Sequence, residues 1–153
     1  MKAYIAALAV IGLAACATET APPPEPEPVM LSDAEFKALW NAAYKSDPES
    51  GAETAFTAML ERDDLTPAQL GEVYYGRGTM RGIYVRDWPE AFPQCALGDF
   101  MIAKDLPLTP ARMKQMKESM EYQVSRQHYF PEAPRLCQEW AAEAAVWLYG
   151  DGS

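Results

Sequence analysis

Few residues of this chain carry side chains that commonly do chemistry. The 153-residue sequence has a single histidine, His128, and three cysteines, Cys16, Cys95 and Cys137. A zinc protease motif needs two histidines on one helix, and a serine hydrolase triad would have to use His128. Two cysteines with one histidine also cannot complete a tetrahedral metal site without carboxylates. We therefore predict no metal and no cofactor, and we interpret His128 as a structural residue in a turn between helices.

Two pairs of acidic residues are the other candidates for catalysis. Asp63 is followed by Asp64, and Glu118 lies close to Glu121 in the sequence. General acid–base catalysis needs carboxylates at a fixed separation, and nothing in the sequence sets the distance within either pair. Solvent-exposed acidic faces explain both pairs, so the sequence favours a protein that is not an enzyme.

One stretch of the chain combines arginines with aromatic residues and includes Tyr74, Arg77, Arg81 and Trp88. The chain as a whole is acidic, with a formal net charge of −9, which argues against binding to nucleic acid. Arginine and aromatic side chains are enriched at the energetic centres of protein interfaces. These four residues are therefore candidate partner-binding residues, and packing of the aromatic rings in the core is the alternative.

The first residues have the pattern of an export signal. Lys2 precedes an apolar run over residues 3–13, and small residues come directly before Cys16. The run is too short to span a membrane stably. The sequence Leu13-Ala14-Ala15-Cys16 resembles the lipobox of bacterial lipoproteins, which implies cleavage before Cys16 and attachment of lipid to that cysteine. Cleavage by the general signal peptidase, which would give a secreted protein, is the alternative.

This interpretation divides the chain into three parts. Residues 1–15 form the signal peptide that is removed, and residues 16–30 form a tether that contains five prolines and no periodic apolar pattern. A proline-rich segment of this length is extended and reaches on the order of 40 Å. Residues 31–150 form one domain, which is large enough to bury a core. The lipoprotein resemblance, with no aspartate at position 17, implies the periplasmic face of the outer membrane.

Cys95 and Cys137 remain once Cys16 is assigned to lipid. An exported protein enters an oxidising compartment, where an even number of cysteines usually pairs. Both cysteines follow a proline by two or three residues, which places them in the first turns of two helices. We predict a disulfide between them, and two buried free thiols are the alternative.

A hexapeptide with the features of a helix start occurs three times. The three copies cover residues 31–36, 65–70 and 108–113. Ser32, Thr66 and Thr109 supply the N-cap hydroxyls, and proline follows two of them at the first helical position. The intervals of 34 and 43 residues between these caps each fit a helical hairpin. Long alternating runs of β-branched residues are absent, so the sequence predicts an all-α fold.

The 34-residue interval, the stripe of Ala52, Phe56 and Met59, and the aromatic residue before Gly76 resemble the tetratricopeptide repeat. The resemblance implies a solenoid of about three stacked antiparallel helical hairpins, with residues 109–150 as a degenerate or capping repeat. The longer second interval and the four glycines expected in one helix depart from that family. A helical bundle without repeats is therefore the alternative.

Together these features predict a lipid-anchored protein that binds a protein or peptide of the bacterial cell envelope through its helical repeats. The membrane contact would come from the lipid on Cys16. An enzyme that acts on peptidoglycan or another envelope polymer through paired carboxylates is one alternative, and a purely structural envelope protein is another. The sequence specifies neither the partner nor the oligomeric state.

Overall fold

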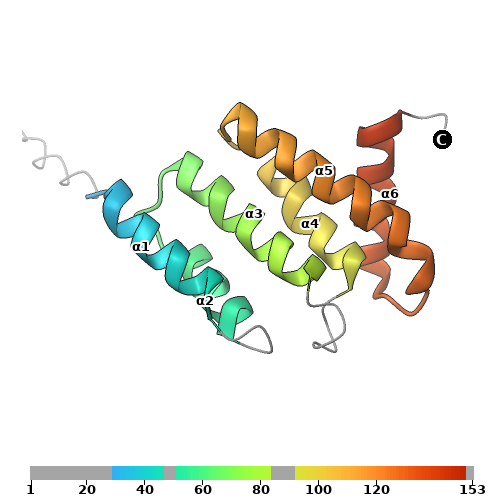
Figure 1. The fold of residues 1–153 in the computed structure, drawn as a ribbon, viewed down its shortest axis with the longest axis horizontal. Coiled ribbons are helices and arrows are strands. Elements are labelled where there is room, and N and C mark those ends of the chain that lie inside the picture. The colour runs from blue at the N-terminus through green and yellow to red at the C-terminus, as the bar shows by residue number, and fades with distance from the viewer. Residues whose placement is uncertain (1–28, 47–50, 84–91, 151–153) are drawn as a thin grey trace, which may run out of the picture.

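The computed structural model describes residues 29–46, 51–83 and 92–150. All regular secondary structure in these ranges is helical, which confirms the predicted all-α class (Figure 1). The elements are α1 (Asp33–Tyr44), α2 (Gly51–Leu60), α3 (Pro67–Ile83), α4 (Pro93–Ala103), α5 (Pro110–Arg126), the short 3-10 helix η1 (Gln127–Tyr129) and α6 (Arg135–Tyr149). The predicted signal peptide, Cys16, the predicted tether up to residue 28, and Trp88 lie outside the described residues.

The three hexapeptides start helices α1, α3 and α5, as predicted. At α1 the backbone N–H of Glu35 donates to the Ser32 hydroxyl over 3.3 Å, and the Glu35 carboxylate accepts from the Ser32 backbone N–H over 3.3 Å. Thr66 and Thr109 accept in the same way at the starts of α3 and α5, over 3.2 Å in each case. Each hydroxyl satisfies a backbone donor that the helix leaves free.

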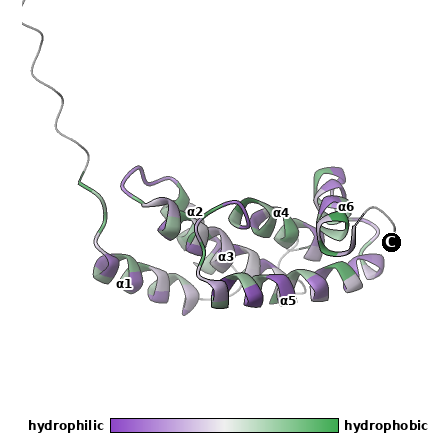
Figure 2. Cartoon of the chain, turned by 90° about the horizontal axis from the view of Figure 1, so that it is seen from above, coloured by the Kyte–Doolittle hydropathy of each residue, from purple (hydrophilic) through white to green (hydrophobic). Residues whose placement is uncertain are grey.

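The helices form two layers. Helices α1, α3 and α5 lie side by side and run in the same direction, and α2, α4 and α6 form the second layer behind them (Figures 1 and 2). Helix α3 is central, because it contacts α1, α2, α4 and α5. Helices α1, α3 and α5 therefore share one face of the domain, and α3 contacts both of the others.

Two hydrophobic clusters meet at α3. The first joins α1, α2 and α3 and contains the fully buried side chains of Phe56 and Val73. The second joins α3, α4, α5 and α6 around Phe100, Met116 and Met120, which are also fully buried. Two methionines of α5 are thus part of the core. Because both clusters use residues of α3, that helix connects the two halves of the domain.

Two glycines of α3 allow the neighbouring helices to approach closely. A Cβ atom at Gly76 would lie 2.6 Å from the ring of Phe56, and one at Gly78 would lie 2.9 Å from the ring of Phe100. Both distances are too short for a carbon–carbon contact, so any larger residue would push a fully buried ring aside.

We expect the substitution Gly76→Ala to lower the free energy of unfolding by about 1–3 kcal/mol, although alanine favours a helix over glycine by up to ~1 kcal/mol. The overlap with Phe56 outweighs the gain in helix propensity. Urea unfolding followed by circular dichroism measures the change. The exposed substitution Lys117→Ala in α5 serves as the control and should change stability by less than about 0.5 kcal/mol. A Gly76→Ala variant more stable than the parent would contradict the packing argument.

Candidate functional site

A groove lies between α1 and α5, with the N-terminal half of α3 at its floor. Its volume is about 640 Å³. The residues that line it are Asp33, Phe36, Lys37, Trp40 and Asn41 of α1, Ala68, Gln69 and Glu72 of α3, and Pro107, Thr109, Ala111, Arg112 and Gln115 of the α5 side. Phe36 and Trp40 supply an aromatic wall, and Pro107 and Ala111 supply a smooth apolar wall opposite. This arrangement gives a groove with apolar walls, with polar residues along both rims and with Gln69 and Glu72 at its floor.

Trp40 is held in place by contacts across the groove. Its indole N–H donates to the backbone carbonyl of Glu72 over 3.0 Å. The Arg112 Nε donates to both carboxylate oxygens of Glu72, over 3.0 and 2.8 Å. The Arg112 guanidinium lies 4.3 Å from the ring centroid of Tyr75 and 5.7 Å from that of Trp40. Residues from α1, α3 and α5 therefore fix one another, so the groove is formed before any ligand enters.

Arg112 stays charged in this position. Burial is the largest single influence and lowers the pKa of its guanidinium, but the hydrogen bonds and the charge of Glu72, together with Tyr75, outweigh it and the net shift is upward. Lys37 lies on the opposite wall, is exposed, and adds a second cation to the groove. The two walls thus each carry one positive side chain.

The polar residues of the groove include two amides on opposite walls. Asn41 belongs to α1 and Gln115 to α5, and both are exposed. The Gln115 Oε1 accepts from Arg112 over 2.8 Å, which orients its amide group. At the end of the groove, Gln69 Nε2 donates to the Leu31 backbone carbonyl and to Asp33, over 3.1 Å each. Amide groups can both donate to and accept from a peptide backbone.

The candidate residues Tyr74, Arg77 and Arg81 lie together in α3 but away from this groove. Arg77 makes two hydrogen bonds to the carboxylate of Asp99 in α4, over 3.0 and 2.7 Å, and a third to Thr57 in α2, over 3.1 Å. The Arg77 guanidinium also lies 5.8 Å from the ring centroid of Tyr74. Its donors are therefore used inside the domain, where they hold α2, α3 and α4 together.

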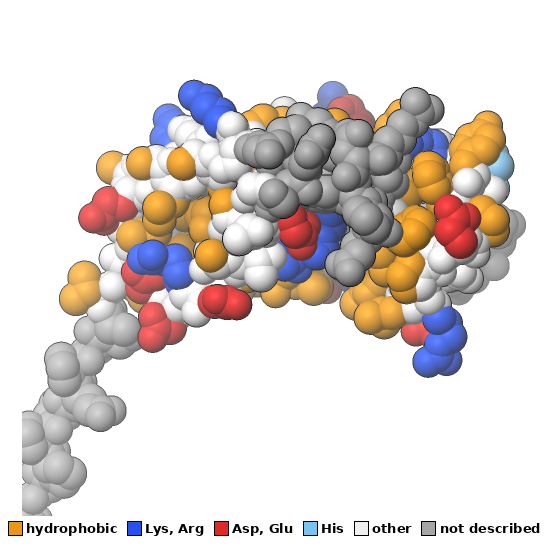
Figure 3. All heavy atoms as spheres, turned by 90° about the horizontal axis from the view of Figure 1, so that it is seen from below, with side chains coloured by type: hydrophobic (Ala, Val, Ile, Leu, Met, Phe, Trp, Pro, Cys, Tyr) orange, Lys and Arg blue, Asp and Glu red, His pale blue; other side chains and the backbone are white. Residues whose placement is uncertain are grey.

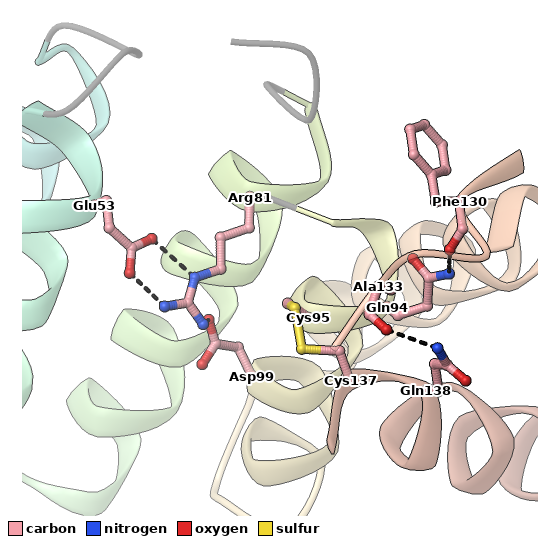
Figure 4. The surroundings of a disulfide bond; sticks show 9 residues. All are labelled: Glu53, Arg81, Gln94, Cys95, Asp99, Phe130, Ala133, Cys137 and Gln138. Atoms are coloured by element: carbon pink, nitrogen blue, oxygen red, sulfur yellow. Dashed lines mark hydrogen bonds and ion pairs between the residues drawn. A yellow bond between two sulfur atoms is a disulfide. The ribbon is translucent and has the colours of Figure 1, made fainter. Parts of the chain in front are cut away.

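Arg81 extends the same network. It bonds to Asp99 over 3.2 Å and forms a two-point ion pair with Glu53 of α2, with the Nε to Oε2 distance at 2.8 Å (Figure 4). The Asp99 side chain is only 3% exposed. Burial raises the pKa of its carboxyl above the ordinary value, and the two arginines oppose that shift. The sequence predicts that Arg77 and Arg81 lie close together. It does not predict that carboxylates from α2 and α4 bind them.

A disulfide joins Cys95 in the first turn of α4 to Cys137 in the first turn of α6, with their Cα atoms 4.5 Å apart (Figure 4). Hydrogen bonds surround it. Gln94 Nε2 donates to the carbonyls of Gln127 and Phe130 over 2.9 Å each, and Gln138 Nε2 donates to the carbonyl of Ala133 over 2.6 Å. These contacts fix the turn before α6 against the start of α4.

On the face shown in Figure 3, basic and acidic side chains lie near one another, and no large basic area offers a surface for a polyanion. Within the described ranges, no three histidine, cysteine or acidic side chains are grouped as metal ligands. None of the helices in that part of the chain combines the length and the apolar character of a membrane span.

No family model, curated protein or solved structure matches this chain. The groove was not among the sites predicted from the sequence, because its walls come from helices far apart in the chain. Phe36 and Trp40, on its α1 wall, are half-buried. Lys37 and Asn41 lie on the same face of α1 as these rings. This combination of polar and aromatic residues was the sequence signal that could have indicated a binding site.

Proposed function

We propose that this protein is a lipid-anchored envelope protein whose helical domain binds an extended peptide segment of a partner in the groove between α1 and α5. The lipobox-like sequence that ends at Cys16 supports the anchor, and the proline-rich residues 16–30 support a spacer between membrane and domain. The localisation that follows is the periplasmic face of the outer membrane. The observation that carries the binding function is the preformed apolar groove of about 640 Å³ with amides and cations on its rims.

The arrangement of the helices supports the more specific proposal that the fold is a tetratricopeptide-like solenoid. Its first helices, α1, α3 and α5, share one face, and its second helices, α2, α4 and α6, share the other. An extended groove of this kind can bind an extended peptide, because the first helix of each hairpin contributes a wall or the floor of the same groove.

The groove can recognise a peptide in two ways. An apolar side chain of the ligand would pack between the rings of Phe36 and Trp40 and the small wall at Ala111. The amides of Asn41 and Gln115 would hold the ligand's backbone from both sides. Specificity would come from the side-chain subsite, and the backbone bonds would contribute affinity for many extended sequences.

The carboxylates of the groove favour binding over acid–base chemistry. Asp33 accepts a hydrogen bond from Gln69 over 3.1 Å, and Glu72 is bound by Arg112 over 2.8 Å. Both carboxylates therefore support the walls of the groove.

The test begins with selection of ligands from an array of random ten-residue peptides on the protein, followed by fluorescence titration of the selected peptides in solution. We expect the double substitution Asn41→Ala and Gln115→Ala to weaken binding by about 5- to 100-fold, since two hydrogen bonds to the ligand are lost. Both side chains are exposed, so the fold should be kept.

The control is Trp147→Ala, which removes a partly exposed ring from α6, far from the groove residues. It should leave the affinity unchanged. An array that yields no ligand, or selected peptides that bind the double variant as tightly as the parent, would refute the proposed function.

A further inference from the structure

Helix α6 has an apolar outer face. It is the last of the described helices, and its buried side packs against α4 and α5 (Figure 1). Four of its large apolar side chains are nevertheless exposed, namely Leu136, Val146, Trp147 and Tyr149, with exposed fractions of 62%, 49%, 40% and 52%. The outer helices of a stack usually carry polar residues on the side that faces water. Several exposed apolar side chains on one helix are typical of a surface that another molecule covers.

The exposed face of α6 has a projection and a hollow. The projection is Leu136, which lies in the first turn of the helix and is the most exposed of these four side chains. The hollow lies between the C-terminal parts of α4 and α6, has a volume of about 430 Å³, and is lined by Met101, Lys104, Ala142, Glu143, Val146 and Trp147. Leu136, Glu143 and Trp147 are seven and four residues apart, so they lie along one stripe of the helix. The projection and the hollow therefore lie on the same side of α6, about two helical turns apart.

Two side chains of opposite charge lie beside these features. Arg135 directly precedes Leu136, its side chain is 91% exposed, and its ion pair with Glu139 is long, at 3.6 Å. Glu143 lines the hollow, and its carboxylate forms no hydrogen bond or ion pair with any described residue. A positive charge thus lies next to the projection, and an unpaired negative charge lies next to the hollow.

This pattern is complementary to itself. A twofold axis that makes two copies of α6 antiparallel brings the first turn of each helix onto the C-terminal half of the other. Leu136 of each copy then enters the hollow of the other copy, and Arg135 meets the other copy's Glu143. Glu139 lies near the axis in both copies, with the Arg135 of its own chain beside it. The symmetry forms each contact twice, as a contact between two identical surfaces requires.

We infer that the outer face of α6 binds the same face of a second copy of this chain, so that the protein forms a symmetric dimer. The inference does not depend on the proposed peptide binding, because the hollow beside α6 and the groove between α1 and α5 share no lining residue. The dimer therefore presents two grooves. A partner that carries two copies of its binding segment would bind such a dimer more tightly than it binds one domain.

Sedimentation velocity tests the dimer in the chain from residue 16 onward, with Cys16→Ser to remove its thiol. The parent should change from monomer to dimer over about 5–500 µM protein, as expected for a small interface. Leu136→Asp should weaken the dimer at least about 50-fold, because each copy loses a leucine that the interface buries. This side chain is exposed in the monomer, so the fold should be kept, which circular dichroism checks. The matched control is Val29→Asp, which is 90% exposed at the other end of the domain and should leave the dimer unchanged.

Exchange of the two charges provides a second set of variants, which stays decisive if Leu136→Asp fails to fold. Arg135→Glu and Glu143→Arg should each weaken the dimer by about 5- to 30-fold, because like charges then meet twice. The two substitutions together restore opposite charges across the interface and should recover most of the affinity. A parent that stays monomeric over the whole concentration range would overturn the inference and leave a different molecule to cover α6. A dimer that the single charge reversals do not weaken, or that the double exchange does not restore, would overturn it as well.

Discussion

Replacing Arg77 with alanine is expected to lower the free energy of unfolding by about 3–5 kcal/mol, which is a large share of the stability of a domain of this size. The Asp99 carboxylate is 3% exposed and receives two of its hydrogen bonds from Arg77. Without that guanidinium, Arg81 alone would face a buried charge, at 3.2 Å and with its other bonds already made to Glu53. Urea unfolding monitored by circular dichroism measures the loss.

The loss should depend on pH in a defined direction. Burial already raises the pKa of Asp99, and removal of Arg77 raises it further. The folded variant then takes up a proton at a pH where the unfolded chain, with an aspartate pKa of about 3.9, does not. Protonation removes the unpaired charge, so the deficit relative to the parent should shrink as the pH falls from about 7 toward 5.

Two further variants distinguish this explanation from a general loss of packing. The double substitution Arg77→Met and Asp99→Leu removes both charges and should recover most of the stability. Arg62→Ala breaks an ion pair with Asp64 whose side chains are 37% and 25% exposed, and it should cost less than about 1 kcal/mol. A pH-independent deficit for Arg77→Ala would show that the buried carboxylate is not its cause.

Removal of the disulfide is the second large effect. Replacing both Cys95 and Cys137 with alanine should lower the free energy of unfolding by about 4 kcal/mol, because the bond closes a separation of 42 residues and restricts the unfolded chain. The effect should be greatest in α6. This helix fully buries few side chains, among them Ala141 and Ala144, and the bond fixes its first turn to α4.

Hydrogen exchange followed by mass spectrometry provides the local measurement. Amides of α6 should exchange faster in the double variant by a factor larger than for α1 and α2, which the bond does not join. Chemical reduction of the parent should reproduce the result. Uniform acceleration across all helices would show that the bond stabilises the domain only as a whole, and unreduced protein with two free thiols would contradict the bond itself.

The local parts of the fold could be predicted from the sequence. Ser32, Thr66 and Thr109 act on backbone groups within three residues of themselves, so short patterns were sufficient to locate the starts of α1, α3 and α5. The pairing of Cys95 with Cys137 followed from the number of cysteines and from the prolines that start their helices.

The groove and the polar network could not be predicted in the same way, because they depend on which helices become neighbours. Arg77 and Arg81 are basic residues next to aromatic ones in the sequence, and only the packing of α4 against α3 shows that Asp99 meets them. Likewise Trp40 and Arg112 are distant in sequence, and they share a site because α1 and α5 stand on either side of α3.

The unequal burial of the helices has a mechanical consequence. Helix α1 fully buries one residue, Ala43, whereas α4 is buried along most of its length and is covalently joined to α6. Tension applied at the N-terminal end of the domain reaches α1 first and would peel α1 and α2 away while the covalently joined half stays folded. The groove would then lose its aromatic wall, so tension would open the groove before the domain as a whole unfolds.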